Sequence, residues 1–187
     1  AGQGEPGPAF EAPRIDWRED DPETARAIRA ERARAREILD LQEGRVTAVP
    51  LLDGSGVERV LRAARRIAVV GASSSPWRPS WGIFRYLRRV GYDAVPVNPD
   101  ESEVDGIRAY PTLAAAVAAT GGFDIVDLFR RSDACPQHAR EAVDIGASVL
   151  WMQQGVVSWE AARIAAAGGL EVAMDRCIMV DHHRYLD

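Results

Sequence analysis

A glycine and three serines follow a short apolar run, and together they have the composition of an anion-binding loop. Residues 67–70 are apolar and lead directly into Gly71-Ala72-Ser73-Ser74-Ser75. Residues 83–90 then carry their apolar side chains at helical spacing. This order predicts a buried strand, a tight loop and a helix. The backbone N–H groups of such a loop and the positive end of the helix can hold a phosphate, although a plain strand-to-helix turn has the same pattern.

The loop differs from the two common phosphate-binding motifs. The next glycine after Gly71 is Gly82, so the G-x-G-x-x-G spacing is absent. All 23 basic residues are arginines, so the chain has no lysine for a Walker loop or a Schiff base. Phosphate recognition must therefore come from arginine, hydroxyl groups or backbone N–H groups. Arg78 is placed to pair with a phosphate at the loop, or else to pack on Trp77 or Trp81 at the surface.

Composition and charge limit the class of protein. A length of 187 residues with 47% hydrophobic and 27% charged residues predicts one soluble globular domain. The net charge of -5 argues against nucleic-acid binding. The two cysteines form no disulfide framework, and no apolar run reaches membrane-spanning length. We therefore expect a cytoplasmic protein with neither nucleic-acid nor membrane partners.

Residues 1–56 are expected to form an N-terminal extension. Residues 1–20 are rich in glycine, proline and acids and cannot bury much surface. A helix is predicted over about 21–43, with a thin apolar stripe that includes Ile38 and Leu39. We expect this helix to pack on the domain, on a second copy in a homo-oligomer, or on a protein partner.

Residues 57–187 are expected to form the main domain. A short helix is predicted to begin at a capping box led by Ser55. Strand and helix patterns then alternate, which predicts an α/β fold: a three-layer, Rossmann-like, doubly wound and mostly parallel sheet. After the first strand at 67–70, the further strands are predicted over 93–97, 123–129, 147–152 and 170–174, with a C-terminal tail over 175–184.

The fold class predicts where a ligand would bind. In doubly wound sheets, ligands bind beyond the carboxyl ends of the strands, where the strand order reverses. Asn98 follows the second strand, where a nicotinamide-dinucleotide site would prefer an acid for the ribose diol; Asp100 comes two residues later. The outlet segments expected to meet at this edge are 73–78, Asn98-Pro99, 129–132 and Gln153-Gln154-Gly155.

These outlet segments resemble those of the small stand-alone CoA-binding proteins. The domain of that family is similar to the N-terminal domain of the succinyl-CoA synthetase alpha subunit. The resemblance covers about residues 57–186, and its specificity comes from seven pieces in order. They are Val70-Gly71-Ala72-Ser73, Arg78-Pro79-Ser80, Gly91-Tyr92, Pro96-Val97-Asn98-Pro99, Asp127-Leu128-Phe129-Arg130-Arg131, Trp151-Met152-Gln153-Gln154-Gly155 and Asp175-Arg176-Cys177.

The resemblance implies binding of coenzyme A or an acyl-CoA without catalysis. The first loop would cradle the diphosphate, Asn98 and Pro99 would flank the nucleotide, and the Gln153-Gln154-Gly155 outlet would lie near the pantetheine. Synthetase activity needs a phosphohistidine in a second domain, so we expect none here. The residues expected to bind the ligand are Gly71, Ala72, Ser73, Ser74, Arg78, Ser80, Val97, Asn98, Pro99, Phe129, Arg130, Arg131, Gln154 and Gly155.

Two other functions fit parts of the sequence. One is an NAD(P)-dependent oxidoreductase; the other is a regulator or subunit that senses acyl-CoA and docks through residues 1–56. Cys135, near the predicted cleft, could form a mixed disulfide with the CoA thiol if a helix start acidifies it. Cys177, His182 and His183 could suggest a metal site or a nucleophile–base pair. Adjacent histidines rarely face the same way, so we expect a structural or surface role for these three.

Overall fold

The computed structural model describes residues 31–32, 35–36, 39 and 49–186. Residues 31, 32, 35, 36 and 39 are helical, and their side chains are exposed. The remainder of the helix predicted over 21–43, and of the segment before it, lies outside the described residues. Within the described part of the chain, no helix combines the length and the apolar character needed to cross a membrane.

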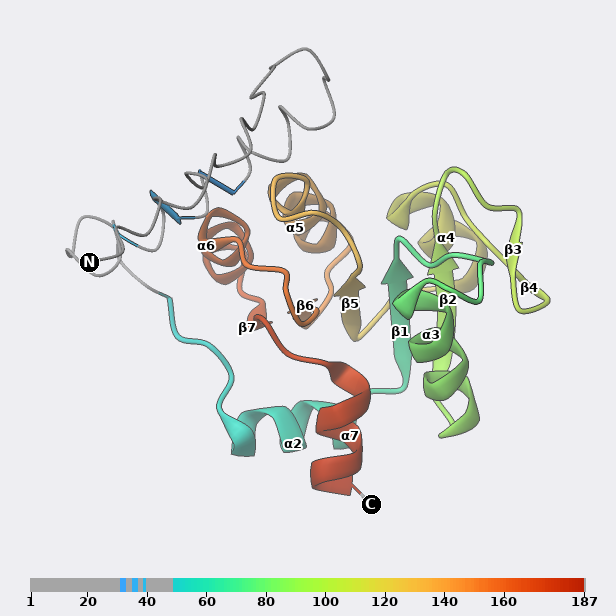
Figure 1. The fold of residues 1–187 in the computed structure, drawn as a ribbon, viewed down its shortest axis with the longest axis horizontal. Coiled ribbons are helices and arrows are strands. Elements are labelled where there is room, and N and C mark those ends of the chain that lie inside the picture. Colours follow the sequence, from blue (N-terminus) through green and yellow to red (C-terminus); the bar gives the residue numbers. More distant parts are fainter. Residues whose placement is uncertain (1–30, 33–34, 37–38, 40–48, 187) are drawn as a thin grey trace, which may run out of the picture.

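A five-stranded parallel sheet forms the centre of the molecule, in the order β2-β1-β5-β6-β7 (Figure 1). The chain passes from β1 outward to β2, then crosses back to β5 on the other side of β1 and continues outward. The strand order therefore reverses between β1 and β5, as a doubly wound sheet requires. The strands are β1 Arg66–Val70, β2 Asp93–Val97, β5 Ile125–Leu128, β6 Val149–Met152 and β7 Glu171–Ala173.

Helices cover both faces of the sheet, which confirms the predicted three-layer Rossmann-like fold. Ala68 and Val70 of β1 face one helical layer, while Ile67 and Val69 face the other. Because both faces are covered, β1 is apolar at nearly every position rather than at alternate ones. One layer holds α4 Leu113–Thr120, α5 Cys135–Asp144 and α6 Trp159–Ala167, and the other holds α2 Gly54–Ala63, α3 Pro79–Arg89 and α7 Ile178–Leu186.

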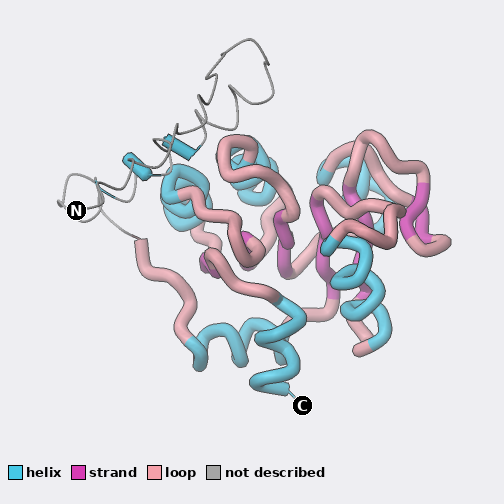
Figure 2. Tube along the Cα trace, in the orientation of Figure 1, coloured by secondary structure: helices cyan, strands magenta, loops and turns pink. Residues whose placement is uncertain are grey.

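Three local features differ from the sequence-based description. The N-cap of α2 is Asp53, whose Oδ1 accepts a hydrogen bond from the Gly56 N–H at 2.8 Å, so the capping box led by Ser55 is wrong. A small antiparallel hairpin of β3 Glu103–Val104 and β4 Ile107–Arg108 follows β2. The C-terminal tail ends in the helix α7, which packs beside α2 (Figure 2).

Candidate functional site

Gly71 ends β1 and directs the chain into the serine-containing loop. Its φ of +84° lies in the region that glycine adopts without strain. Its N–H donates to the carbonyl oxygen of Val97 in β2 at 2.8 Å. A Cβ at this position would lie 2.5 Å from the carbonyl oxygen of Phe129 and 3.0 Å from the side chain of Arg130. The loop thus passes so close to the outlet of β5 that only glycine fits.

The loop after Gly71 already holds an anion, the carboxylate of Glu101. Oε1 of Glu101 accepts hydrogen bonds from the Ser73 hydroxyl at 3.1 Å and from the Ser74 N–H at 2.8 Å. The N–H of Ser75 donates to the Ser73 Oγ at 3.2 Å. α3 begins four residues after Ser75 with Pro79, which suits the first helical position because that position needs no N–H partner. The loop therefore has the donors that an oxyanion site requires, and the start of a helix follows it in the chain.

A cavity of about 760 Å³ lies at the carboxyl edge of the sheet, next to this loop. Its size is typical of a small-molecule site. The outlets of all five strands contribute to its wall, which includes the reversal point between β1 and β5. The lining residues are Gly71, Ser73, Arg78, Pro79, Ser80, Ile83, Asn98, Asp100, Glu101, Phe129, Arg130, Arg131, Gln153, Gln154, Val156 and Cys177.

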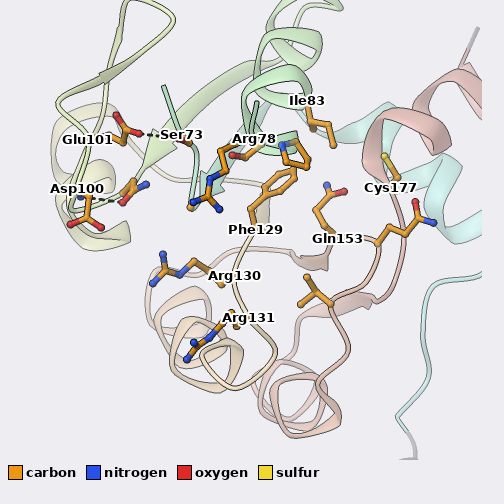
Figure 3. A pocket seen from close by; sticks show the side chains of 16 residues that line it. Ser73, Arg78, Ile83, Asp100, Glu101, Phe129, Arg130, Arg131, Gln153 and Cys177 are labelled. Carbon is orange, nitrogen blue, oxygen red and sulfur yellow. Dashed lines mark hydrogen bonds between the residues drawn. The ribbon is translucent and has the colours of Figure 1, made fainter. Parts of the chain in front are cut away.

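The charge of the cavity wall changes from one edge of the sheet to the other. Asp100 lies beyond β2, Arg78 beyond β1 and Arg130 beyond β5, whereas the uncharged Gln153 and Cys177 lie beyond β6 and β7. Figure 3 shows Asp100 on one side of the cavity, Cys177 on the opposite side and Arg78 between them. Among the described residues, neither Arg78 nor Arg130 has an ion-pair or hydrogen-bond partner for its side chain. Two guanidinium groups are thus available to a ligand at the middle of the cavity.

Arg131 and Asn98 have partners within the protein. Arg131 also lines the cavity, but its guanidinium pairs with Asp133 at 2.9 Å. The Asn98 amide donates to the carbonyl oxygen of Ala72 at 2.8 Å, and its Oδ1 accepts from the N–H of Asp100 at 3.1 Å. Asn98 therefore ties the outlet of β2 to the loop after β1.

Most of the residues predicted from the sequence line the cavity, and five do not. Ala72 is fully buried, and Ser74 is exposed beside the cavity, with its N–H bound to Glu101. Val97 and Pro99 line a neighbouring cavity of about 220 Å³, to which Arg130 also contributes. The N–H of Gly155 donates to Oδ1 of Asp175 at 2.6 Å. The predicted residues on the cavity wall are Gly71, Ser73, Arg78, Ser80, Asn98, Phe129, Arg130, Arg131 and Gln154.

Several lining residues are absent from the sequence-based site. Cys177 follows the last strand, so the rule that ligands bind beyond strand ends would have included it. Glu101 lies further along the outlet of β2, and no pattern in the sequence indicates that its carboxylate turns back to Ser73. The predicted set of binding residues also omitted Pro79, Ile83, Asp100 and Val156, and it left out Gln153 although Gln153 lies in a predicted outlet segment.

The suggestion of an acidified Cys135 is wrong. Its side chain is fully buried at the start of α5, and its Sγ donates to the carbonyl oxygen of Arg131 at 3.4 Å. Burial raises the pKa of the Cys135 thiol to about 12, with Asp133 adding to the effect and Arg130 opposing it. A buried, protonated thiol cannot exchange with a ligand thiol at neutral pH.

The two adjacent histidines of α7 lie in different environments, because His183 is exposed and His182 faces the interior. His182 is buried, and its Nδ1 lies 2.8 Å from the Tyr86 hydroxyl of α3. The rings of Tyr86 and Tyr92 pack edge-on against His182. In the described part of the chain, no group of three or more histidine, cysteine or acidic side chains could hold a metal ion.

A buried carboxyl group lies in β5 behind the cavity wall. Asp127 is fully buried, and its Oδ1 accepts a hydrogen bond from Nε2 of the cavity residue Gln153 at 2.8 Å. Oδ2 has no partner among the described residues. Burial raises the pKa of Asp127 to about 8, although the bond from Gln153 lowers it in part. At neutral pH this side chain is therefore mainly the uncharged acid.

Replacing Asp127 with asparagine is expected to remove a pH dependence of stability. An unfolded chain loses the Asp127 proton near pH 3.8, whereas the folded protein keeps it up to about pH 8. The contribution of the Asp127 proton to the stability of the folded state is therefore fully present below pH 3.8. It is lost progressively as the pH rises from 3.8 to about 8, and it is absent above that pH. The melting temperature of Asp127→Asn should exceed that of the wild type by a margin that widens between pH 4 and 8. Parallel melting profiles of the two proteins over this range would contradict the assignment.

The comparisons with known proteins match the part of the chain that forms this sheet and its cavity. A family model described as a CoA binding domain matches residues 65–183. The uncharacterized protein YneT of Bacillus subtilis (strain 168) is 39% identical over 126 residues, which cover 67% of this chain and 91% of YneT. A hypothetical protein from Pyrococcus horikoshii OT3 superposes with a TM-score of 0.69 at 31% identity, covering 76% of this chain and 100% of its own. A Thermus thermophilus structure superposes with a TM-score of 0.67 at 33% identity, covering 72% and 100%.

Proposed function

Because this chain belongs to the CoA-binding domain family, we propose that it binds coenzyme A or an acyl-CoA in the cavity at the carboxyl edge of the sheet. The diphosphate of the ligand lies on the loop of residues 71–75. The observation that carries this proposal is the loop itself, because its Ser73 hydroxyl and Ser74 N–H already bind a carboxylate oxygen. The loop also borders a cavity with two arginines, Arg78 and Arg130, whose side chains have no partner in the part of the chain that the structure describes.

The distribution of charge on the cavity wall indicates how the ligand is oriented in the cavity. The phosphates lie beyond β1 and β5, near the guanidinium groups of Arg78 and Arg130. The uncharged pantetheine arm runs along the outlets of β6 and β7, toward Gln153 and Cys177. From β1 to β7 the sheet spans three strand spacings of about 4.8 Å, so an elongated ligand has roughly 14 Å of wall to follow.

A nicotinamide dinucleotide is the competing ligand. It shares the adenosine and the diphosphate with coenzyme A, so the loop alone does not distinguish them. Asp100 on the cavity wall is the feature that its ribose diol would use. Membership of the CoA-binding family and the uncharged residues that follow β6 and β7 on the cavity wall favour coenzyme A.

Mass spectrometry of the protein purified under non-denaturing conditions tests this proposal. We expect a retained small molecule with the mass of coenzyme A or of an acyl-CoA. The same sample after denaturation should release that molecule, which fragmentation can then identify. A retained nicotinamide dinucleotide in place of coenzyme A would contradict the proposal.

A further inference from the structure

Glu101 occupies donors that a ligand phosphate would need. Its Oε1 accepts hydrogen bonds from the Ser73 hydroxyl at 3.1 Å and from the Ser74 N–H at 2.8 Å. Figure 3 shows the Glu101 carboxylate turned toward Ser73 at the cavity wall. Among the described residues, the hydrogen-bond partners of the Glu101 side chain are Ser73 and Ser74 of this loop. Its carboxylate therefore holds the position of a bound oxyanion.

The hydrogen bonds between this loop and Glu101 have an ionised carboxylate as their acceptor. Hydrogen bonds from Ser74, and then from Ser73, lower the pKa of Glu101, so the carboxylate is ionised at neutral pH. The Ser73 hydroxyl has a single proton, and the Ser74 N–H points at one acceptor. A phosphate oxygen that takes these donors must displace Oε1 of Glu101, and the two like charges repel each other at this distance.

We propose that Glu101 is an internal competitor of the ligand phosphate and sets the affinity and the selectivity of the site. This inference rests on the proposed function, because it places the ligand diphosphate on the same loop. A ligand must bring an oxyanion that replaces the carboxylate, so the site discriminates against compounds without a phosphate. On displacement, the Glu101 side chain turns toward solvent, which its partial exposure allows.

The opposite role for Glu101 would be that of a brace. In that case its hydrogen bonds to Ser73 and Ser74 would hold the loop in a binding-competent shape, and ligand binding would leave them intact. The two roles differ in the sign of one measurement. Removing a competitor strengthens binding, whereas removing a brace weakens it.

Titration calorimetry of Glu101→Ala, with Asp100→Ala as the matched control, separates the two roles. Both variants remove one negative charge from the same cavity wall, but only the first frees Ser73 and Ser74. If the carboxylate occupies the loop in nine molecules of ten, Glu101→Ala should bind coenzyme A about tenfold more tightly. Asp100→Ala should gain clearly less, and that gain should shrink at high salt. Pantetheine, which has no phosphate, should not bind Glu101→Ala more tightly.

Weaker or unchanged binding of coenzyme A by Glu101→Ala would overturn the proposal, as would equal gains in the two variants. Inorganic pyrophosphate serves as a second probe of the loop and is expected to show the same ranking. If wild type and both variants fail to bind coenzyme A but bind pyrophosphate in this ranking, the proposed function is wrong and the role of Glu101 stands. If pyrophosphate binds Glu101→Ala no better than wild type, the competitor role is wrong whatever coenzyme A does.

Discussion

Replacing Gly71 with valine is expected to abolish binding of coenzyme A. A Cβ at this position would lie 2.5 Å from the backbone oxygen of Phe129, and φ is +84°. The side chain can only be accommodated if the loop moves away from β5, which displaces the donors of Ser73 and Ser74. Two hydrogen bonds to a charged group contribute about 1.5–3 kcal/mol each, so we expect at least a roughly 100-fold loss of affinity.

The matched control for this variant is Gly106→Val. Gly106 also has a positive φ, +75°, but a Cβ there meets nothing within 4 Å. In both variants the valine must adopt an unfavourable positive φ, but only Gly71→Val distorts the loop of residues 71–75. Calorimetry should be done below the melting temperature of each variant, as established by circular dichroism. Wild-type affinity in folded Gly71→Val would show that the diphosphate does not bind at this loop.

Replacing Arg78 with alanine is expected to weaken coenzyme A binding by about 10- to 150-fold, the range for one lost charge-assisted hydrogen bond. Arg78 lies on the cavity wall directly before α3, and its guanidinium has no ion-pair or hydrogen-bond partner among the described residues. Its removal should therefore cost little stability. Isothermal titration with coenzyme A measures the effect.

Arg89→Ala provides the control for Arg78→Ala. Arg89 lies at the other end of α3, where its guanidinium stacks on Tyr86 away from the candidate site. Arg78→Ala and Arg89→Ala each remove one positive charge, so any general electrostatic effect on binding should be common to both variants. Equal affinities of the two variants for coenzyme A would mean that Arg78 makes no direct contact with the ligand.

The sheet was predictable because both of its faces are buried. Apolar runs mark β1 and β6, β5 is apolar except for Asp127, and a glycine or a polar outlet marks where each run ends. The alternation of these runs with helical segments fixes the parallel, doubly wound arrangement. α7 was not predicted, because its buried residues Ile178 and His182 pack against helices that are distant in the sequence.

The cavity was predictable in outline and less so in detail. The rule that ligands bind beyond strand ends brought Gly71, Arg78 and Phe129 to one place, because it depends only on topology. The inward turn of Glu101 depends on the backbone path directly after Asn98, and a one-residue change of path there would point the side chain into solvent. The sequence likewise does not indicate whether a cysteine in the first turn of a helix faces the core, as Cys135 does.

Calorimetric titration of the ligand-free protein with coenzyme A, dephospho-CoA and NAD tests the central claim most directly. All three ligands carry an adenosine and a diphosphate, so differences report on the parts that distinguish coenzyme A. We expect coenzyme A to bind most tightly, dephospho-CoA to bind more weakly because it lacks the 3′-phosphate that would contact the arginine-lined wall, and NAD to bind far more weakly still. Binding of NAD as tight as that of coenzyme A, or tighter, would contradict the assignment of this cavity to coenzyme A.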